Sequence, residues 1–428
     1  MKILVNGAAG LIGSAVCARL ARDGHDVVAA VRHEGDRRPP GSTAVVVAEM
    51  GSTLAGRWAE LLQGVDVVVN CAGTFQDSAR DSTSAVHVTG ADQLFSACED
   101  VGVRRVIHFS AIGVDRETPS AFSATKREGD ENLKRRNLDW VILRPSVVLG
   151  RGVYGASALF RGLAALPRLP LMQGTGELQV VQLDDVAETV ARLVAQDAPA
   201  KQEIELVGPE RLSFAGVIAE YRRWLGWKPA RTFAAPRFLE TLLYKLGDAA
   251  GWLGWRPAVR STASREIGRG AVGDGTAWRN ATGIEPVSLR AALAAQPATV
   301  QERWFARLFL LKPVIFVVLA AFWLATGIIS LTVGYDIGVG LMLAGGAGIL
   351  AGPSVVAGAL ADIVIGLSIS FRRTTRLGLW GAILLSLFYA VAGTLILPEL
   401  WKEPLGPLLK IWPILVLHFV ALGILEER

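Results

Sequence analysis

Two long stretches without a charged residue constrain this chain more than any other feature. Residues Pro313 to Tyr335 and Leu377 to Pro398 contain only apolar, small and uncharged polar residues. A transmembrane helix needs about 20 such residues to cross the ~30 Å hydrocarbon core of a bilayer. Because backbone hydrogen bonds must be satisfied within the membrane, we expect these stretches to be helical. The C-terminal part of the chain is therefore predicted to be an all-α membrane domain.

Two further segments complete a predicted set of four membrane helices, at about 311–332, 353–371, 377–397 and 406–425. Residues 337–351 are also apolar, but this segment is short and rich in glycine. It is interpreted either as a fifth span or as a piece that enters the bilayer without crossing it.

Basic residues favour four spans over five. Arg303, Arg307 and Lys312 precede the first span, and a second cluster that includes Arg372 and Arg376 lies between the second and third. Cytoplasmic loops of membrane proteins are enriched in Lys and Arg. With four spans both clusters face the cytoplasm, whereas five spans place the second cluster outside. We therefore expect a multi-pass protein of the cytoplasmic (inner) membrane, with its N-terminal domain and both termini in the cytoplasm.

Two ionisable side chains fall inside these spans. Asp362 lies midway along the second span and His418 near the middle of the fourth. A charged group at the centre of a membrane helix costs roughly 3 kcal/mol on insertion scales, so such groups are candidates for function. They are interpreted as a proton relay or a quinone headgroup site, or alternatively as a polar clasp between helices.

The N-terminal part of the chain carries a different pattern. The apolar run Lys2–Asn6 is followed by Gly7-Ala8-Ala9-Gly10-Leu11-Ile12-Gly13, a helical pattern up to Asp23 and a second apolar run at Asp26–Val31. This pattern predicts a strand, a glycine turn, a helix and a strand. Such glycines allow a tight turn and a close approach to a pyrophosphate, whose charge the helix N-terminus attracts. We therefore predict a dinucleotide site.

The residue after the second strand reports on the adenosine ribose. Domains that prefer NAD place an acid there to bind the 2′-hydroxyl. This chain has Arg32, followed by His33, with Arg37 and Arg38 nearby. A guanidinium suits a 2′-phosphate through charge-assisted hydrogen bonds. NADP(H) is therefore the favoured cofactor, and NAD(H) is the alternative.

Further motifs of this part resemble the short-chain dehydrogenase/reductase family. They are the turn Asn70-Cys71-Ala72-Gly73, the strand Val106–Ser110, the loop Arg144-Pro145-Ser146, the helix start Asp185-Val186-Ala187 and the strand Glu205–Pro209. The likeness covers roughly residues 1–230 and lies nearest the atypical and extended members, among them the nucleotide-binding accessory subunit of complex I. It implies an α/β fold of the Rossmann type, with a doubly wound parallel sheet and a small substrate lobe.

The resemblance also implies which residues bind the cofactor. They are Gly7, Ala9, Gly10, Leu11, Ile12, Gly13, Arg32, Glu49, Met50, Cys71, Ala72, Gly73, Ser110, Lys126, Pro145 and Val148. Active family members carry Tyr-x-x-x-Lys, in which the lysine lowers the tyrosine pKa and the tyrosine transfers a proton. Here Phe122 replaces the tyrosine, so Lys126 is the one tentative catalytic residue of this motif. Tyr154 is a further candidate proton donor.

The C-terminal part resembles the DoxX-like four-helix family, on its hydropathy and on the stretch Ala357–Gly366. The predicted domains are residues 1–230, which bind NAD(P) and include substrate-lobe elements from 151, a tryptophan-rich amphipathic linker or lobe at 231–305, and a transmembrane domain at 306–428.

The linker region holds an apolar row at helical spacing. Within Pro236 to Trp255, the apolar residues include four that recur at the spacing of one helix face. The residues are Phe238, Leu239, Leu242, Leu243 and Leu246, followed by Trp252 and Trp255. The row is interpreted either as core packing or as a helix that lies on the bilayer, with tryptophan at the headgroup level.

Composition excludes some classes of function. The net charge is +5 and the basic residues are scattered, so no nucleic-acid partner is expected. Cys17, Cys71 and Cys98 have a spacing that suits neither a metal site nor a disulfide framework.

We therefore expect a membrane-anchored NAD(P)H-binding protein, an oxidoreductase for a hydrophobic membrane substrate such as a quinone or an isoprenoid. The alternative is a catalytically inactive nucleotide-binding module that stabilises a membrane redox complex or senses nucleotide for it, as the loss of the tyrosine and the complex I resemblance suggest.

Overall fold

The computed structural model describes residues 1–35, 38–79 and 81–425. Within them the chain forms two compact units. The first joins Met1–Asp248 to Pro257–Ala306, and the second joins Ala249–Arg256 to the chain from Arg307 onward. The chain therefore enters the second unit briefly, returns to the first, and then leaves it again.

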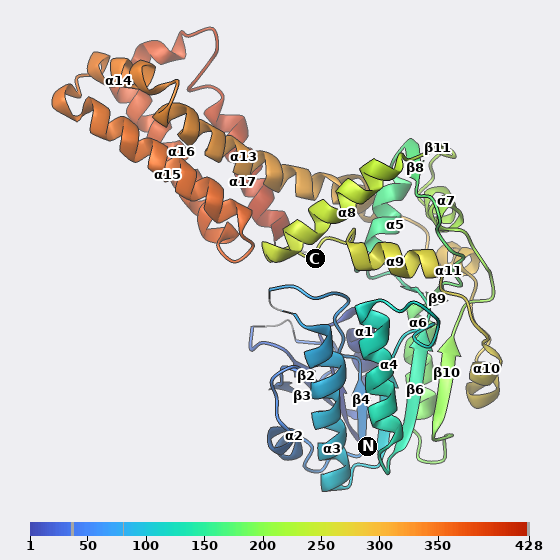
Figure 1. The fold of residues 1–428 in the computed structure, drawn as a ribbon. Coiled ribbons are helices and arrows are strands. Elements are labelled where there is room, and N and C mark those ends of the chain that lie inside the picture. The colour runs from blue at the N-terminus through green and yellow to red at the C-terminus, as the bar shows by residue number, and fades with distance from the viewer. Residues whose placement is uncertain (36–37, 80, 426–428) are drawn as a thin grey trace. The chain divides into compact units, whose positions relative to one another are not determined.

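The first unit is built around a parallel sheet of seven strands among the described residues, in the order β10-β6-β5-β4-β1-β2-β3 (Figure 1). The strands are β1 (Lys2–Asn6), β2 (Asp26–Val31), β3 (Ala44–Val47), β4 (Val67–Asn70), β5 (Arg105–Phe109), β6 (Asp139–Pro145) and β10 (Gln202–Leu206). The order reverses its direction between β1 and β4, where open α/β sheets bind their ligands.

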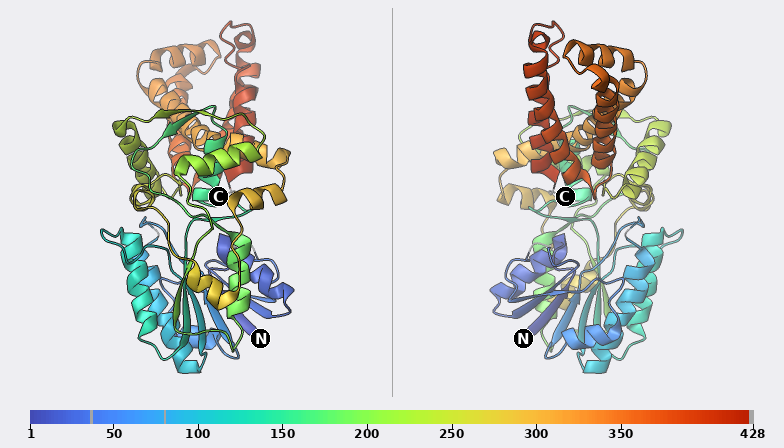
Figure 2. Two further views of the ribbon diagram at one scale, coloured as in Figure 1. Left: turned by 90° about the vertical axis from the view of Figure 1, so that its right-hand side faces the viewer. Right: turned by 90° about the vertical axis from the view of Figure 1, so that its left-hand side faces the viewer.

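Helices cover both faces of this sheet, as Figure 2 shows from the two sides. Alternate side chains of a strand belong to opposite faces. Ile3 and Val5 pack in one core and Leu4 in the other. The first face carries α1 (Leu11–Arg22), α6 (Leu183–Leu193) and α10 (Thr276–Thr282), and the second carries α2 (Ala55–Leu61), α3 (Gly90–Val101) and α4 (Ala121–Lys134). The predicted doubly wound Rossmann-like fold is confirmed.

A smaller lobe completes the first unit around a separate core that includes Phe160, Phe214 and Tyr221. Its helices are α5 (Ala156–Ala164), α7 (Phe214–Trp224), α8 (Arg237–Trp252), α9 (Ser261–Arg269), α11 (Leu289–Ala295) and the first part of α12 (Val300–Phe309). Its short strands pair as β7 (Val148–Leu149) with β9 (Val181–Gln182), and as β8 (Arg168–Leu171) with β11 (Arg231–Ala234).

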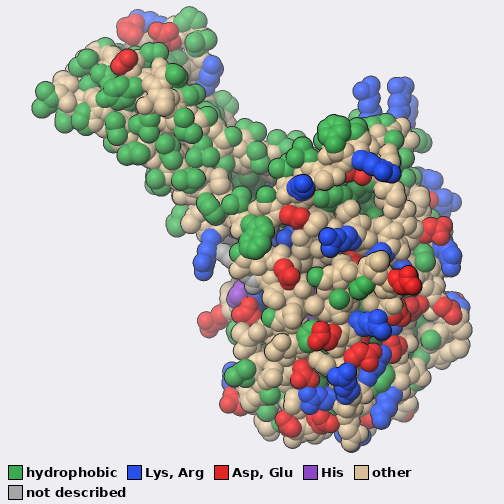
Figure 3. Space-filling view, in the orientation of Figure 1, with side chains coloured by type: hydrophobic (Ala, Val, Ile, Leu, Met, Phe, Trp, Pro, Cys, Tyr) green, Lys and Arg blue, Asp and Glu red, His purple; other side chains and the backbone are tan. Residues whose placement is uncertain are grey.

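The second unit is helical, and hydrophobic side chains predominate over charged ones on the part of its surface seen in Figure 3. Among the described residues, three segments are long and apolar enough to cross a membrane. They are α13 (Leu311–Leu331), the segment Gly348–Ser370 that contains α15 (Ala351–Ser370), and α16 (Thr375–Ile396). Three of the four predicted spans are thereby confirmed as candidate membrane helices.

The other two apolar segments form shorter helices. α17 (Ile411–Leu425) begins later than the predicted start at residue 406, and its 15 residues extend ~22 Å, less than the hydrocarbon thickness. The segment 337–351 gives α14 (Tyr335–Ala344), whose 10 residues extend only ~15 Å. A turn follows α14 before α15 begins, so this segment does not form one continuous span.

Close contact between α13 and α15 rests on two glycines. A Cβ at Gly327 would lie 2.5 Å from the Ala359 carbonyl oxygen, and one at Gly366 would lie 2.8 Å from the Leu324 nitrogen. Small residues allow membrane helices to approach closely, and dispersion contacts then hold them together.

Candidate functional site

The glycine turn after β1 is packed too tightly for side chains. Gly7 has φ +72°, and a Cβ there would lie 2.8 Å from the backbone nitrogen of Ala72. A Cβ at Gly13 would lie 2.9 Å from the Ala8 Cα and closer still to the Gly7 carbonyl oxygen. The turn therefore brings the start of α1 against the ends of β1 and β4.

Helix α1 begins at Leu11, with Gly10 as its N-cap and no side chain capping its first turn. The backbone N–H groups at the start of a helix have no partner within the helix. Those of Leu11, Ile12 and Gly13 are thus available to an anion at the point where the strand order reverses. Ala9 lies within the turn itself.

Arg32 follows β2 directly, as predicted, and the structure gives it an acidic partner. Its Nη1 donates to Oδ1 of Asp81 at 2.7 Å. Arg38 donates to the carbonyl oxygens of Ser42 and Thr43, and Arg37 lies outside the described residues. A 2′-phosphate bound at Arg32 would share the guanidinium with the Asp81 carboxylate.

Glu49 and Met50 follow β3. Glu49 is exposed and accepts a hydrogen bond from the Ser52 hydroxyl at 3.2 Å. Met50 is buried, with its sulfur 3.0 Å from the Asn6 side-chain nitrogen. Met50 therefore packs behind the glycine turn, whereas Glu49 lies at the surface beside it.

Lys126 is buried on α4 beside the turn after β4. Its ammonium donates to the Phe109 carbonyl oxygen at 2.7 Å and to that of Ala72 at 3.4 Å. Burial lowers the pKa of Lys126 to about 8, and the Asp130 carboxylate opposes part of this shift. A Cβ at Gly73 would lie 3.4 Å from the ammonium nitrogen. Lys126 is therefore held at the carboxyl ends of β4 and β5, with Cys71, Ala72 and Gly73 alongside.

Phe122 occupies an aromatic cluster one turn before Lys126. Its ring centroid lies 4.9 Å from that of Phe75 and 5.6 Å from that of His87. His87 accepts from the Thr74 backbone nitrogen, and burial lowers its pKa to about 2. Neither the phenyl ring nor this neutral histidine supplies an acidic proton near neutral pH.

Behind the site lies a buried polar network that the sequence analysis did not predict. Asp130 accepts from the Ser110 hydroxyl at 2.7 Å and pairs with Arg144 at 3.3 Å. Its other oxygen lies 3.6 Å from Nε2 of His108. Burial raises the pKa of Asp130 to about 6. Asp130 follows Lys126 by four residues on one helix, and this spacing is the sequence signal that could have placed the two side chains on the same helix face.

The remaining members of this network tie strand ends together. Asn70 lies within 3.1 Å of His108 Nδ1 and accepts from the Asn6 side chain at 3.0 Å. Asn6 ends β1 and Asn70 ends β4, so the network fixes the strand ends that carry the turns. Pro145 ends β6 and Val148 begins β7, and Tyr154 is exposed. The cofactor roles of these residues, like those of all the others named from the sequence, stay predictions.

In the membrane unit, Asp362 and His418 have different partners. Tyr389 donates to Asp362 at 3.2 Å, and the lack of a side chain at Gly358 leaves room for the Tyr389 hydroxyl. Trp323 donates to His418 Nε2 at 2.9 Å, while His418 Nδ1 lies 2.7 Å from the Ile414 carbonyl oxygen. Because a carbonyl only accepts, Nδ1 carries the proton and the ring is neutral.

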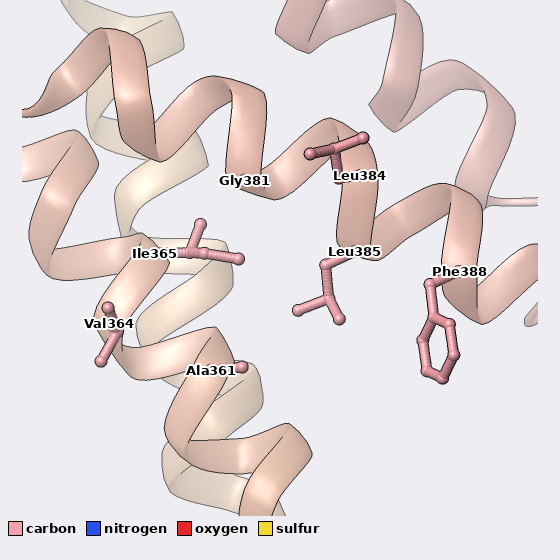
Figure 4. Close-up of a pocket in the computed structure, with 7 residues that line it drawn as sticks. All are labelled: Ala361, Val364, Ile365, Gly381, Leu384, Leu385 and Phe388. Atoms are coloured by element: carbon pink, nitrogen blue, oxygen red, sulfur yellow. The ribbon is translucent and has the colours of Figure 1, made fainter.

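A groove of about 420 Å³ lies between α15 and α16. Its lining includes Ala361 and Phe388, the residues that precede Asp362 and Tyr389 in the sequence. Figure 4 shows Ile365 and Leu385 pointing into it from opposite helices. The lining side chains are all apolar, so they offer no hydrogen bond to a polar headgroup.

Two family models match separate parts of the chain. Residues 7–197 match the NAD(P)H-binding family, and residues 320–419 match the DoxX-like family. The chain joins an NAD(P)H-binding Rossmann domain to a DoxX-like domain. The resemblance predicted from the glycine turn and the apolar helices is confirmed for both parts.

Relatives of the NAD(P)H-binding domain include several oxidoreductases. The 40 kDa subunit of mitochondrial NADH-ubiquinone oxidoreductase from Neurospora crassa is 28% identical over 218 residues, which are 50% of this chain and 57% of the subunit. Sterol demethylase protein B of Methylococcus capsulatus is 24% identical over 71% of this chain and 99% of its own. An uncharacterised protein of Mycobacterium tuberculosis is 27% identical, and the chain spans only 23% of its length.

Solved structures share the fold of the NAD(P)H-binding domain. MoeE5, solved with UDP-glucuronic acid and NAD, has a TM-score of 0.55 and 19% identity over 72% of this chain and 99% of its own. WbmG of Bordetella bronchiseptica, solved with NAD, has a TM-score of 0.54 and 17% identity over 69% of this chain and 92% of its own.

Proposed function

We propose that this protein is a membrane-anchored oxidoreductase that transfers hydride from NADPH to a hydrophobic membrane substrate of the quinone or isoprenoid type. The observation that carries the proposal is Lys126, whose buried ammonium lies at the carboxyl ends of β4 and β5 although Phe122 stands where the family has its proton donor. The site thus keeps a residue suited to the nicotinamide ribose but lacks the acid that an ordinary ketone needs.

The chemistry of the product favours a quinone. Hydride transfer to a simple ketone forms a localised alkoxide, which needs a positioned acid. Hydride transfer to a quinone forms an aryl oxide whose charge is delocalised over the ring, and a phenol such as tyrosine has a pKa of about 10. Water can protonate this anion. Bound NADPH would supply the hydride and become NADP⁺, and the quinone would gain this hydride and one proton to give a hydroquinone.

Arg32 supports NADP(H) over NAD(H). The residue directly after β2 is Arg32 rather than an acid, and its guanidinium is half-buried and already oriented by Asp81. Such a group binds a 2′-phosphate by charge-assisted hydrogen bonds.

The relatives support a lipid-like substrate through their names. Beside the ubiquinone oxidoreductase subunit and the sterol demethylase protein, they include a ceramide reductase of Caulobacter vibrioides, 26% identical over 197 residues. The DoxX-like domain would hold the site near such a substrate. Both basic clusters support a cytoplasmic location of the NAD(P)H-binding domain and of both termini, in the inner membrane.

The test is a titration of the detergent-solubilised protein with NADPH and NADH, with nucleotide oxidation followed in the presence of short-chain quinones. We expect tighter binding of NADPH and steady oxidation, both weakened in Lys126→Met. Phe122→Tyr is the second variant, since a general acid contributes about 10²–10⁴-fold where it is needed. We expect it to create turnover with simple ketones and to change quinone turnover little.

The inactive nucleotide-binding module is the second candidate, and Phe122 is the observation that favours it. It predicts tight NADPH binding, no oxidation with any quinone and no new activity in Phe122→Tyr. Its partner would be a membrane redox complex, as the similarity to the Neurospora subunit suggests.

A further inference from the structure

Helix α8 is amphipathic, but it buries its polar face and exposes its apolar face, the reverse of a helix on the surface of a soluble domain. Its buried or half-buried face carries Glu240, Tyr244, Gly247, Asp248 and Gly251. Its apolar residues point outward, with exposed fractions of 74% for Phe238, 39% for Leu239, 48% for Leu242, 51% for Leu243, 57% for Leu246 and 68% for Trp252. A surface helix normally buries its apolar stripe. The core-packing interpretation of this row is therefore wrong.

Specific contacts hold the polar face of α8 against the rest of the first unit. Tyr244 donates to the Met172 sulfur at 2.9 Å, and Glu240 accepts from the Gln173 backbone at 3.2 Å. Asp248 accepts from Gln76 at 2.8 Å. A Cβ at Gly247 would overlap the backbone of Val259, with the carbonyl carbon 3.0 Å away. The helix cannot turn its leucines inward without breaking these contacts.

The end of α8 passes into the membrane unit. Trp255, three residues past the helix, packs on Phe316 of α13 with ring centroids 4.8 Å apart. Its indole donates to the Ser370 carbonyl oxygen at 2.8 Å, at the end of α15, and Arg372 lies 5.7 Å from its ring. Phe316 lies near the start of one span and Ser370 at the end of the next. The segment that follows the exposed row in the sequence is thus anchored within the membrane unit, by α13 and the end of α15.

We propose that α8 lies in the surface of the bilayer, with its apolar row among the acyl chains and its polar face on the NAD(P)H-binding domain. The occupant of the row is lipid. Exposed apolar patches of this kind mark binding surfaces, and a helix with leucine and tryptophan on one face inserts about 5–10 Å into the headgroup boundary. Arg237 and Lys245 flank the row and suit anionic headgroups.

The same helix is linked to the site. Gln76, which bonds Asp248, also accepts from the Thr262 backbone at 3.3 Å, and Arg260 donates to the Asp77 carbonyl oxygen at 2.9 Å. Phe75, the residue before Gln76, packs on Phe122. The loop after β4 therefore joins the lipid-facing helix to the aromatic cluster. Resting on the proposed function, we infer that a membrane substrate enters the site past this loop.

The test places nitroxide labels on the full chain in vesicles of phosphatidylcholine and phosphatidylglycerol. Labels go at Leu242→Cys and Leu246→Cys, with Thr241→Cys as the matched control, because Thr241 is exposed on the same helix but outside the apolar row. The parent protein measures background labelling, which should be low because Cys17 and Cys98 are buried and Cys71 half-buried. NADPH binding shows that each variant is folded.

We expect the ratio of collisions with oxygen to collisions with a water-soluble nickel complex to be severalfold higher at residues 242 and 246 than at Thr241. Equal ratios at all three positions would overturn the proposal. Protection of residues 242 and 246 from both reagents would also overturn it, since a protein partner would then cover the row. This readout needs no turnover, so it stands even if the proposed oxidation fails.

Substrate entry has its own measurement. The double variant Leu242→Gln, Leu246→Gln should lower oxidation of NADPH by a long-chain quinone embedded in the vesicle severalfold, while a water-soluble short-chain quinone reacts as before. An equal loss with both quinones would refute the entry route, because the defect would then lie in the site itself.

Discussion

Substitution of Gly13 by alanine tests whether the start of α1 holds the cofactor pyrophosphate. The added Cβ would lie 2.9 Å from the Ala8 Cα, whereas carbon atoms pack best at about 3.5–4.0 Å. The obstructing atoms are backbone, so the first turn of α1 must move by ~0.6–1 Å. A displacement of about 1 Å in an active site lowers the rate about 100-fold, and we take the same factor for the contacts with the pyrophosphate. We therefore expect the Kd for NADPH to rise ~100-fold, or about 3 kcal/mol.

Two other glycines supply matched controls. A Cβ at Gly10 would lie 3.2 Å from the Gly7 carbonyl oxygen, so Gly10→Ala should weaken binding by a smaller factor. Gly56 lies in α2 with nothing within 4 Å of a Cβ. Gly56→Ala should leave the Kd unchanged and stabilise its helix by roughly 0.5–1 kcal/mol.

The assay is a fluorescence titration with NADPH, accompanied by thermal unfolding to show that each variant is folded. A folded Gly13→Ala protein with the affinity of the parent would refute the assignment of the pyrophosphate to this helix start. Equal losses at Gly13 and Gly56 would show that the effect is not local.

Three further outcomes follow from particular contacts. The pKa of Lys126 is lowered to about 8, so its charge is present below that pH and lost above it. The affinity for NADPH should therefore fall as the pH rises through 8. Lys126→Met should lack this pH dependence in the same titration. Asp81→Asn removes the carboxylate that shares Arg32, so the ratio of NADH to NADPH dissociation constants should rise, whereas Arg32→Asp should invert it. His418→Leu leaves the Trp323 N–H without its acceptor and should cost about 1 kcal/mol in denaturation of the full chain, with part of the loss recovered in the double variant with Trp323→Phe.

Local patterns predicted the sheet and its first turn. A short apolar run bounded by glycine, such as Lys2–Asn6 before Gly7, can be recognised from neighbouring residues alone, and so can the glycine turn. The network around Asp130 was not predictable in this way, because Asp130 is on α4 whereas its partners Ser110 and Arg144 lie just after β5 and in β6. The ion pair between Arg32 and Asp81 likewise joins residues that are distant in the sequence.

The membrane helices show a different limit. Hydropathy located α13, α15 and α16 because a charge-free run of that length has few other structures open to it. It did not locate the start of α17, since residues 406–410 are apolar enough to extend the pattern but form a turn. For α8, the periodicity of the sequence predicted an apolar face but not whether that face points into the protein or away from it. The tertiary contacts of Tyr244 and Asp248 determine that it points away.

The order of synthesis adds a consequence of the segment Ala249–Arg256. A ribosome makes the chain from the N-terminus, and domains generally fold as they emerge. Trp255 emerges long before its hydrogen-bond partner Ser370, which lies 115 residues later. Until the second span is inserted, the indole has no native acceptor and the chain on either side of it already belongs to the nucleotide-binding unit. A protein that ends near residue 306 would lack both Phe316 and Ser370, so Trp255 would never gain its native contacts. Its indole would stay exposed, as the leucine row of α8 is. We expect such a protein to associate with itself or with a membrane.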